Sequence, residues 1–179
     1  MSKKRSFYYF KAAPLDTAAI LAIQIENIEQ NIESLERGRQ GFLSFALSER
    51  SLHSCMKLNL VRGAMRRKNH RFTGFVAGMP ASSATYVPWV LPTIDFIRSS
   101  FSYPCFLQLC VEKQNRRKGI GTNLLNQIKF EARKQQFNAL ISVVQKDNTP
   151  GVLFLLQQGF SVLQAPFSDR AIFYLEDDF

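Results

Sequence analysis

The chain has 179 residues, of which 46% are hydrophobic and 12% aromatic, and its formal net charge is +9. This composition is typical of a globular protein and excludes extended disorder, and the length suits a single domain spanning residues 1–179. No window approaches the roughly 20 apolar residues of a membrane span, so no membrane partner is expected.

The first half of the chain predicts a strand, two helices and an antiparallel hairpin. Aromatic residues mark the strand, isoleucines at helical spacing mark the first helix, and the polar turn RRKNH joins the two hairpin strands. The expected elements are a strand at 7–13, a helix at about 17–36, a short helix from about Ser48, and strands at 58–65 and 71–79. Four prolines in 80–104 predict a long loop with a helical piece at 92–100.

The second half alternates strands with helices. We expect strands at 105–111, 138–144, 160–163 and 170–176, and helices at 121–136 and 152–158. Thr149 is the expected N-cap of the second helix, followed by Pro150, and Gly159 suits the left-handed residue after it. The alternation predicts parallel pairing through crossovers, and therefore a mixed α/β domain.

The cysteines and the N-terminal segment indicate the cellular compartment in which the protein is expected. The three cysteines lack CxxC spacing, and Cys105 and Cys110 are expected on opposite faces of one strand, as buried thiols of a reducing environment. The apolar stretch after Pro14 is interrupted by Asp16, unlike a signal peptide. A cytoplasmic protein is therefore expected.

Positive charge gathers on the predicted hairpin. Six cations lie between Lys57 and Arg71, and no acidic residue occurs from position 50 to 94. Such a field favours an anionic partner, namely nucleic acid, an acidic membrane or a phosphorylated cofactor, but a basic surface without a dedicated partner explains it equally well. Because no nucleic-acid-binding motif is present, a nucleic-acid partner is disfavoured.

Residues 115–121 read NRRKGIG and lie between an apolar strand and a helix. A helix N-terminus presents unpaired amides at the positive end of the helix dipole, and glycines let the backbone approach a ligand closely. Three consecutive cations add charge at the rim, so the turn predicts a phosphate site. The sequence of this turn does not match the GxxxxGK[ST] or GxGxxG motif of other phosphate-binding loops.

In these residues the chain resembles the GNAT superfamily of acetyl-CoA-dependent N-acetyltransferases, which carry [QR]-x-x-G-x-[GA] after a central strand. The resemblance covers 107–160, including an Asn before the last helix and a closing Gly-Phe, and the opening segment is similar to the family's first strand and helix. It implies a GNAT-like fold with a central mixed sheet of about six to seven strands flanked by helices.

The resemblance also implies roles for individual residues. Val111 would pair with the pantetheine arm, Leu109 and Cys110 would lie beside the thioester with their amides polarising its carbonyl, and Asn148 would hydrogen-bond the CoA arm or the helix start. A turn residue is the alternative for Asn148. The expected pyrophosphate site consists of Arg116, Arg117, Lys118, Gly119, Ile120 and Gly121.

The catalytic groups depart from the family's pattern. In the motif N-x-x-A-x-x-x-Y, this chain has Gly151 for the Ala and Leu155 for the Tyr, which is the family's general acid. Tyr103 and Tyr174 are candidate replacements. Glu112 is a candidate general base acting through a water, and the alternative is a solvated carboxylate pairing with Lys113 or Arg116.

Three functions follow from these patterns. The leading one is transfer of an acetyl group from acetyl-CoA to a primary amine of a small molecule or peptide, by direct attack in a ternary complex; a homodimer is an allowed assembly. The second is a CoA-binding relative with weak or no chemistry, and the third is nucleic-acid binding. His53 and His70 lack metal-ligand spacing, so no metal is expected. Candidate residues of the acceptor pocket are Asn27, Gln30, Asn31 and Arg37.

Overall fold

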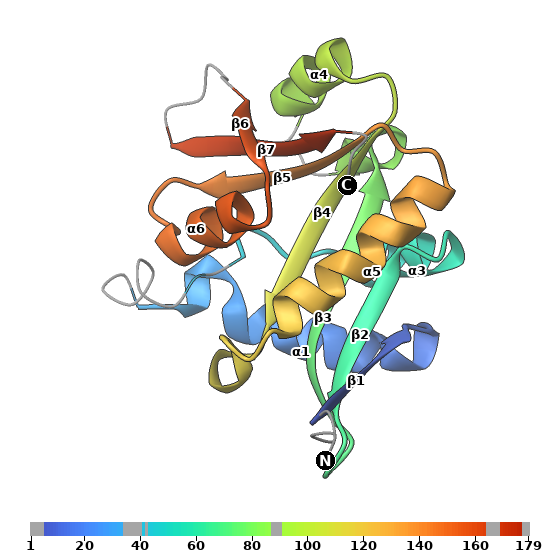
Figure 1. The fold of residues 1–179 in the computed structure, drawn as a ribbon, viewed down its shortest axis with the longest axis vertical. Helices are drawn as coiled ribbons and strands as arrows, with labels where there is room; N and C mark the ends of the chain where they lie inside the picture. The colour runs from blue at the N-terminus through green and yellow to red at the C-terminus, as the bar shows by residue number, and fades with distance from the viewer. Residues whose placement is uncertain (1–5, 34–40, 42, 87–90, 164–168, 177–179) are drawn as a thin grey trace.

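A computed structural model describes residues 6–33, 41, 43–86, 91–163 and 169–176, with a seven-stranded mixed sheet at its centre. The strand order is β1-β2-β3-β4-β5-β7-β6 (Figure 1). The strands are β1 (Phe7–Lys11), β2 (Val61–Arg66), β3 (Arg71–Pro80), β4 (Pro104–Val111), β5 (Ala139–Gln145), β6 (Ser161–Leu163) and β7 (Arg170–Glu176). The α-helices are α1 (Thr17–Asn27), α3 (Glu49–Lys57), α4 (Leu91–Ser100), α5 (Ile120–Lys134) and α6 (Thr149–Gln157). The expected central mixed sheet of about six to seven strands, flanked by helices, is confirmed.

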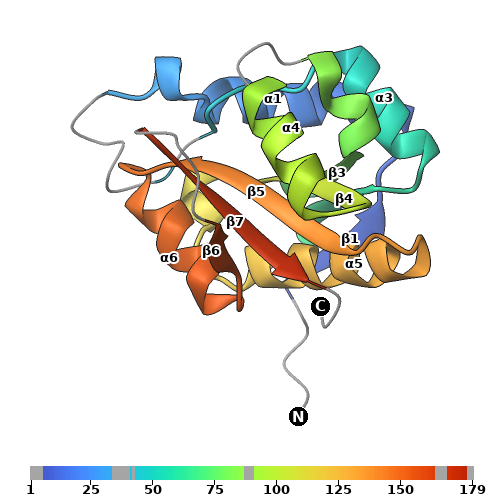
Figure 2. The same ribbon diagram turned by 90° about the horizontal axis from the view of Figure 1, so that it is seen from above.

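Helices cover both faces of the sheet, as Figure 2 shows from above. The face covered by α1, α3 and α4, here named the α1 face, buries Ile20, Leu52 and Ile97 in one apolar cluster. The opposite face, named the α5 face, is covered by α5 and α6 and buries Leu125 and Leu155. Side chains alternate between the two clusters along β4, β5 and β7, as the pleat of a strand requires.

The two strand cysteines follow this alternation. Cys105 is buried in the cluster of the α5 face and Cys110 in that of the α1 face. The predicted placement on opposite faces is therefore confirmed, and both thiols are unbridged.

The first helix is shorter than the predicted span of 17–36. α1 ends at Asn27, and Ile28 takes an extended conformation with φ −74° and ψ 143°. A parallel bridge between Ile28 and Leu43 replaces further helical turns, with the Leu43 amide donating to the Asn27 carbonyl at 2.8 Å. The isoleucine spacing was therefore misleading, because Ile32 is buried without belonging to α1.

Among the strands that the structure describes, the predicted parallel pairing holds for one pair. β4 and β5 are parallel, whereas β7 runs antiparallel to both β5 and β6. Because β7 inserts between them, β5 and β6 run in the same direction without pairing. The crossover through α6 therefore keeps the expected strand direction, but the C-terminal hairpin adds the antiparallel strand.

α6 begins earlier than the predicted span of 152–158, and its N-cap differs from the predicted one. Asn148, rather than Thr149, is the N-cap, and its side chain accepts a hydrogen bond from the Gly151 amide at 3.1 Å. Gly159 has φ +88° and is the left-handed residue after the helix, as predicted.

β4 and β5 separate soon after they begin to pair. Their pairing covers Pro104, Cys105 and Phe106 against Ala139, Leu140 and Ile141, and then ends. Beyond this point β4 stays paired with β3, and β5 stays paired with β7. The sheet therefore opens into a V, visible in Figure 1 between the two strands.

Within the part of the chain that the structure describes, no helix has both the length and the apolar character that crossing a membrane would need.

Candidate functional site

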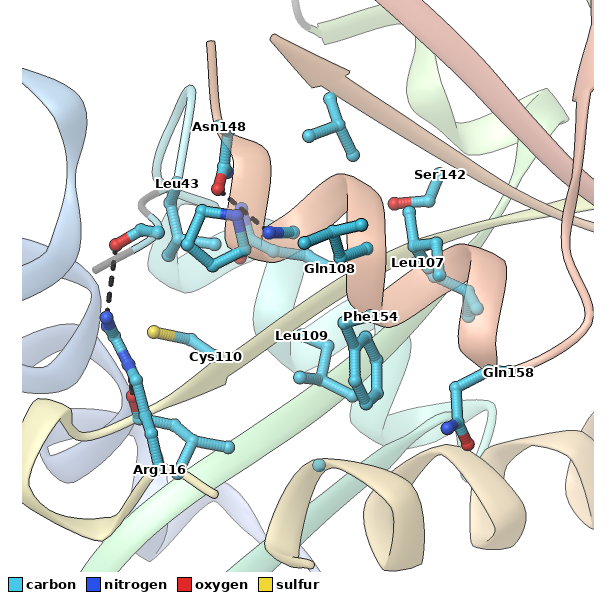
Figure 3. A pocket seen from close by; sticks show the side chains of 18 of the residues that line it. Leu43, Leu107, Gln108, Leu109, Cys110, Arg116, Ser142, Asn148, Phe154 and Gln158 are labelled. Atoms are coloured by element: carbon cyan, nitrogen blue, oxygen red, sulfur yellow. Dashed lines mark hydrogen bonds between the residues drawn. The ribbon is translucent and has the colours of Figure 1, made fainter. Parts of the chain in front are cut away.

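A cavity of about 850 Å³ occupies the opening between β4 and β5 (Figure 3). Its walls come from the second half of β4, from Ser142–Val144 of β5, from α6 and from the segment around Leu43–Phe45. The turn before α5 and the first turn of that helix complete the lining. The predicted strand, glycine turn and helix therefore meet at one cavity.

The turn before α5 has the conformation that its glycines predict. Gly119 is the N-cap of α5, with φ +76° and ψ 4°, in the left-handed region that favours glycine. Arg117 also has a positive φ, of 57°, which is uncommon for a residue with a side chain. At Gly121 a Cβ atom would lie 3.3 Å from the Phe154 ring, so this glycine permits close packing between α5 and α6.

The three cations of the turn lie differently. Arg117 is exposed and lines the cavity. Lys118 folds back on the turn, where its Nζ donates to the Gln114 carbonyl at 2.8 Å and to Asn115 Oδ1 at 3.1 Å. Of these two side chains, only that of Arg117 borders the cavity.

Arg116 is half-buried and points into the protein. Its Nε donates to the Val111 carbonyl at 2.8 Å, its Nη1 to the Gly41 carbonyl at 3.2 Å, and its Nη2 to Asn27 Oδ1. Burial lowers the pKa of this guanidinium. The side chain connects α1, the segment at Gly41 and the end of β4, and Figure 3 shows it at the edge of the cavity.

A buried polar cluster supports the turn from below. Glu112 is 5% exposed and accepts hydrogen bonds from Arg71 and from Asn115 Nδ2. Asn115 is fully buried, and its Oδ1 accepts from Arg66 at 2.6 Å and from Lys118. The alternative of a solvated Glu112 is therefore wrong, and this carboxylate does not border the cavity among the described residues.

The hairpin cations have structural partners. Besides Arg66 and Arg71, Arg62 forms an ion pair with Glu131 of α5 at 2.8 Å, and Arg67 lies over the Tyr8 ring at 5.6 Å. Much of the basic cluster at 57–71 therefore anchors the turn and α5 to the hairpin. Asn115 and these hairpin cations are site-supporting residues that the sequence did not identify.

Asn148 lies at the cavity wall as the N-cap of α6. Its side chain fits there because position 151 is glycine, where a Cβ would lie 2.9 Å from Asn148 Oδ1. Glycine in place of the family motif's alanine at position 151 therefore leaves room for the Asn148 side chain to cap α6.

The tyrosine candidates lie away from the cavity. Tyr103 precedes β4 at the end opposite the glycine turn, is 45% exposed and stacks on Phe137 with ring centroids 4.5 Å apart. Tyr174 packs against Phe101 on the α1 face. Leu155 is buried and lines the cavity, at the position where the family motif has tyrosine.

The lining of the cavity includes the Cys110 thiol and the buried side-chain amides of Gln108, Asn115 and Asn148. Burial raises the pKa of Cys110 to about 12, although Arg116 opposes the shift. The described lining residues include no carboxylate, imidazole or phenol. Gln108 is buried on the same strand. Among the described residues, no group of three or more His, Cys, Asp or Glu side chains is arranged to hold a metal ion.

The predicted acceptor residues do not line this cavity within the described chain. Asn27 is buried and donates to the Ile23 carbonyl at 2.8 Å. Gln30 is exposed, Asn31 donates to the Ile25 carbonyl at 2.6 Å, and Arg37 lies outside the described residues.

Solved structures with the same fold are numerous. The PaiA N-acetyltransferase of Thermoplasma acidophilum, solved in complex with coenzyme A, has a TM-score of 0.65 at 17% identity, over 96% of this chain and 99% of that one. The polyamine N-acetyltransferase of Drosophila melanogaster has a TM-score of 0.67 at 13% identity, over 95% and 99%. An agmatine N-acetyltransferase has a TM-score of 0.68 at 13% identity, over 96% and 99%. Among curated protein sequences, none is significantly similar.

The sequence itself matches a family model. The acetyltransferase (GNAT) family model covers residues 64–160, from β2 through the glycine turn to the end of α6. That span is more than half of the 179 residues and contains most of the cavity wall. The chain therefore belongs to the acetyltransferase (GNAT) family.

Proposed function

We propose that the protein is an acetyl-CoA-dependent N-acetyltransferase that acts on a primary amine. The observation that carries the proposal is the cavity between β4 and β5, with the N-terminus of α5 and its glycine turn at one end. Family membership supports acetyl transfer as the reaction, and neighbours named for agmatine and polyamines support an amine as the acceptor.

The turn fits the pyrophosphate of CoA. Gly119 and Gly121 place backbone without side chains at the start of α5, where the helix dipole favours an anion, and Arg117 adds an exposed cation. We assign pyrophosphate binding to this turn, from Arg116 to Gly121, with the Arg116 side chain fixing the turn and Arg117 supplying charge.

The open half of β4 fits the pantetheine arm and the thioester. Val111 and its neighbours offer strand backbone to the arm. The Glu112 amide donates to the Thr73 carbonyl of β3. By the alternation of a strand, the Cys110 amide therefore also faces β3, and of the two expected amides only that of Leu109 faces the opening. The Leu109 amide is therefore assigned to the carbonyl oxygen, a form of stabilisation that is usually a large catalytic contribution. Acetyl-CoA, when bound, supplies an acetyl thioester: the amine nitrogen bonds to the acetyl carbon, the carbon–sulfur bond breaks, and one proton passes overall from nitrogen to sulfur. Leu107, Leu109 and Phe154 form an apolar wall that limits water (Figure 3).

The proposal is tested by calorimetry with CoA and by a thiol-release assay with acetyl-CoA. The amines are agmatine, spermidine, a peptide with a free N-terminus and a lysine peptide. Binding of CoA together with amine-dependent thiol release is expected. Binding without release from any amine would favour the second function, a CoA-binding protein without turnover, for which Leu155 is the specific observation.

Reversing the charge of Arg117 should weaken CoA binding by about 10- to 100-fold, because charge-assisted hydrogen bonds contribute about 1.5–3 kcal/mol. The change Arg117→Glu keeps a side chain at the same positive φ, so backbone strain is matched. The matched control is Lys134→Glu, which makes the same charge change at the exposed far end of α5. Equal affinities of the two variants, measured by calorimetry at low salt, would contradict the assigned phosphate site.

The pH dependence of kcat/KM should follow the pKa of the amine substrate. Because the Cys110 pKa of about 12 keeps this thiol neutral, and the described lining offers no other acid or base near neutrality, the amine itself must lose its proton before attack. The value of kcat/KM should rise with pH and level near about 8 for an α-amine and near about 10.4 for a lysine-type amine. One plateau pH for both acceptors would instead indicate a protein base.

A further inference from the structure

Gln108 occupies the point of the V between β4 and β5. It is two residues beyond Phe106, the last β4 residue that pairs with β5. Its side chain is 7% exposed and lines the cavity. A side chain at this point borders both the strand opening and the cavity, where the reacting groups of the proposed transferase would meet.

One end of the Gln108 amide is anchored, which fixes the direction of the other. Nε2 donates to the Phe45 carbonyl at 2.8 Å. Turning the amide over would bring Oε1 against that carbonyl, so two acceptors would face each other. The contact therefore assigns the nitrogen to Phe45 and directs the oxygen away from it.

Oε1 of Gln108 is buried, and no residue in the described part of the chain donates to it. Buried acceptors in folded proteins are nearly always paired, so an exception calls for a reason. Gln24 provides an internal comparison: it is fully buried, its Nε2 donates to the Leu47 carbonyl at 3.2 Å, and its Oε1 accepts from the Leu47 amide at 2.7 Å. This fold therefore pairs both ends of a buried glutamine where the role is structural.

The side of the sheet identifies which substrate meets this oxygen. Gln108 is two residues from both Phe106 and Cys110, so it points to the same side of β4 as they do, which is the α1 face. Phe45, whose carbonyl accepts from Gln108, packs on that face as well. Leu107 and Leu109 point to the α5 face, where α5 carries the assigned pyrophosphate site. The unpaired oxygen therefore lies on the side of β4 away from that site.

We infer that Gln108 Oε1 accepts a hydrogen bond from an N–H of the acceptor amine and so orients its nitrogen toward the thioester. The inference rests on the proposed acetyl transfer and adds the residue that binds the second substrate. The ligand class is an amine that retains an N–H donor when it reaches the cavity. The neutral amide oxygen of Gln108 suits an amine substrate that is uncharged when it reaches the cavity.

Two variants separate the oxygen from the anchor. Gln108→Met keeps the size of the side chain but removes both the acceptor and the Phe45 contact. Gln108→Glu also loses the donor to Phe45 but keeps an acceptor oxygen. Gln127→Met, on α5 and outside the cavity lining, is the matched control for the chemical change. Thermal unfolding establishes that each variant is folded.

For Gln108→Met, kcat/KM for the best amine of the panel should fall by about 10- to 100-fold, as expected for an unpaired donor in a buried site. The Kd for CoA, measured by calorimetry, should stay within about twofold, because the site of Gln108 faces away from the turn. Gln108→Glu should retain activity well above that of Gln108→Met, and Gln127→Met should match the wild type.

The failures of the two proposals differ. If the wild type releases no thiol with any amine, acetyl transfer itself fails and the assignment of Gln108 fails with it. If the wild type is active but folded Gln108→Met is equally active, only the assignment of Gln108 is overturned. A loss of CoA affinity equal to the loss of kcat/KM, or equal losses in Gln108→Met and Gln108→Glu, would also overturn it.

Discussion

Replacing Leu155 by tyrosine is expected to raise kcat by about 10- to 100-fold. A positioned general acid typically contributes 10²–10⁴-fold, and the family motif has tyrosine at this place in α6. The lower part of that range is expected, because a thiol with a pKa near 8.5 is already a fair leaving group. Leu155 is buried and lines the cavity, so a phenol at this position can extend into it. Steady-state kinetics at saturating acetyl-CoA, with the best amine of the panel, measure the change.

The control for this gain is Leu156→Tyr. Leu156 lies on the same helix, is 46% exposed and does not border the cavity, so a phenol there should leave kcat unchanged. An unchanged kcat in Leu155→Tyr, with CoA affinity intact, would mean that departure of the thiol does not limit turnover in this protein.

Replacing Glu112 by alanine should lower the free energy of unfolding by about 2–3 kcal/mol. The change leaves Asn115 Nδ2 buried without its acceptor and removes the partner of Arg71, which is itself about half exposed and so contributes less than a buried pair. For a chain of this length the expected fall in Tm is about 4–12 °C. The affinity for CoA should fall as well, since the cluster holds the turn before α5.

Two further variants separate support of the turn from base catalysis. Glu49→Ala removes an exposed carboxylate and should change Tm by little. Glu112→Gln keeps an acceptor for Asn115 and should keep most of the CoA affinity. If Glu112 is instead the general base, Glu112→Gln would lower kcat strongly while Tm and the Kd for CoA stay at their wild-type values.

Features set by neighbouring residues were predictable from the sequence. The turn at 115–121 combines glycines, cations and the start of a helical pattern within seven residues, and the left-handed conformation of Gly119 follows from that local pattern. The same holds for Gly159 and for the opposite faces of Cys105 and Cys110. In each case the determining contacts are local.

Features set by residues far apart in the chain were not predictable in this way. Arg71 meets Glu112 across 41 positions, Arg66 meets Asn115 across 49, and Arg116 meets Asn27 across 89. The sequence placed Arg116 at a phosphate site and left open a solvated Glu112 that pairs with Lys113 or Arg116. Arg116 does line the cavity, but the sequence did not indicate its contact with Asn27 or the burial of Glu112. Tertiary packing decides instead, because both side chains lie where the hairpin or α1 covers them.

The V between β4 and β5 has a consequence for solubility. Unpaired strand edges usually invite pairing with another chain, and proteins protect them with charges, bulges or covering loops. Here the two diverging edges face each other across the cavity, while β3 and β7 occupy their outer sides. The fold can therefore keep hydrogen-bonding backbone available to a ligand without placing it on the perimeter of the sheet, where a second molecule could extend the strand order.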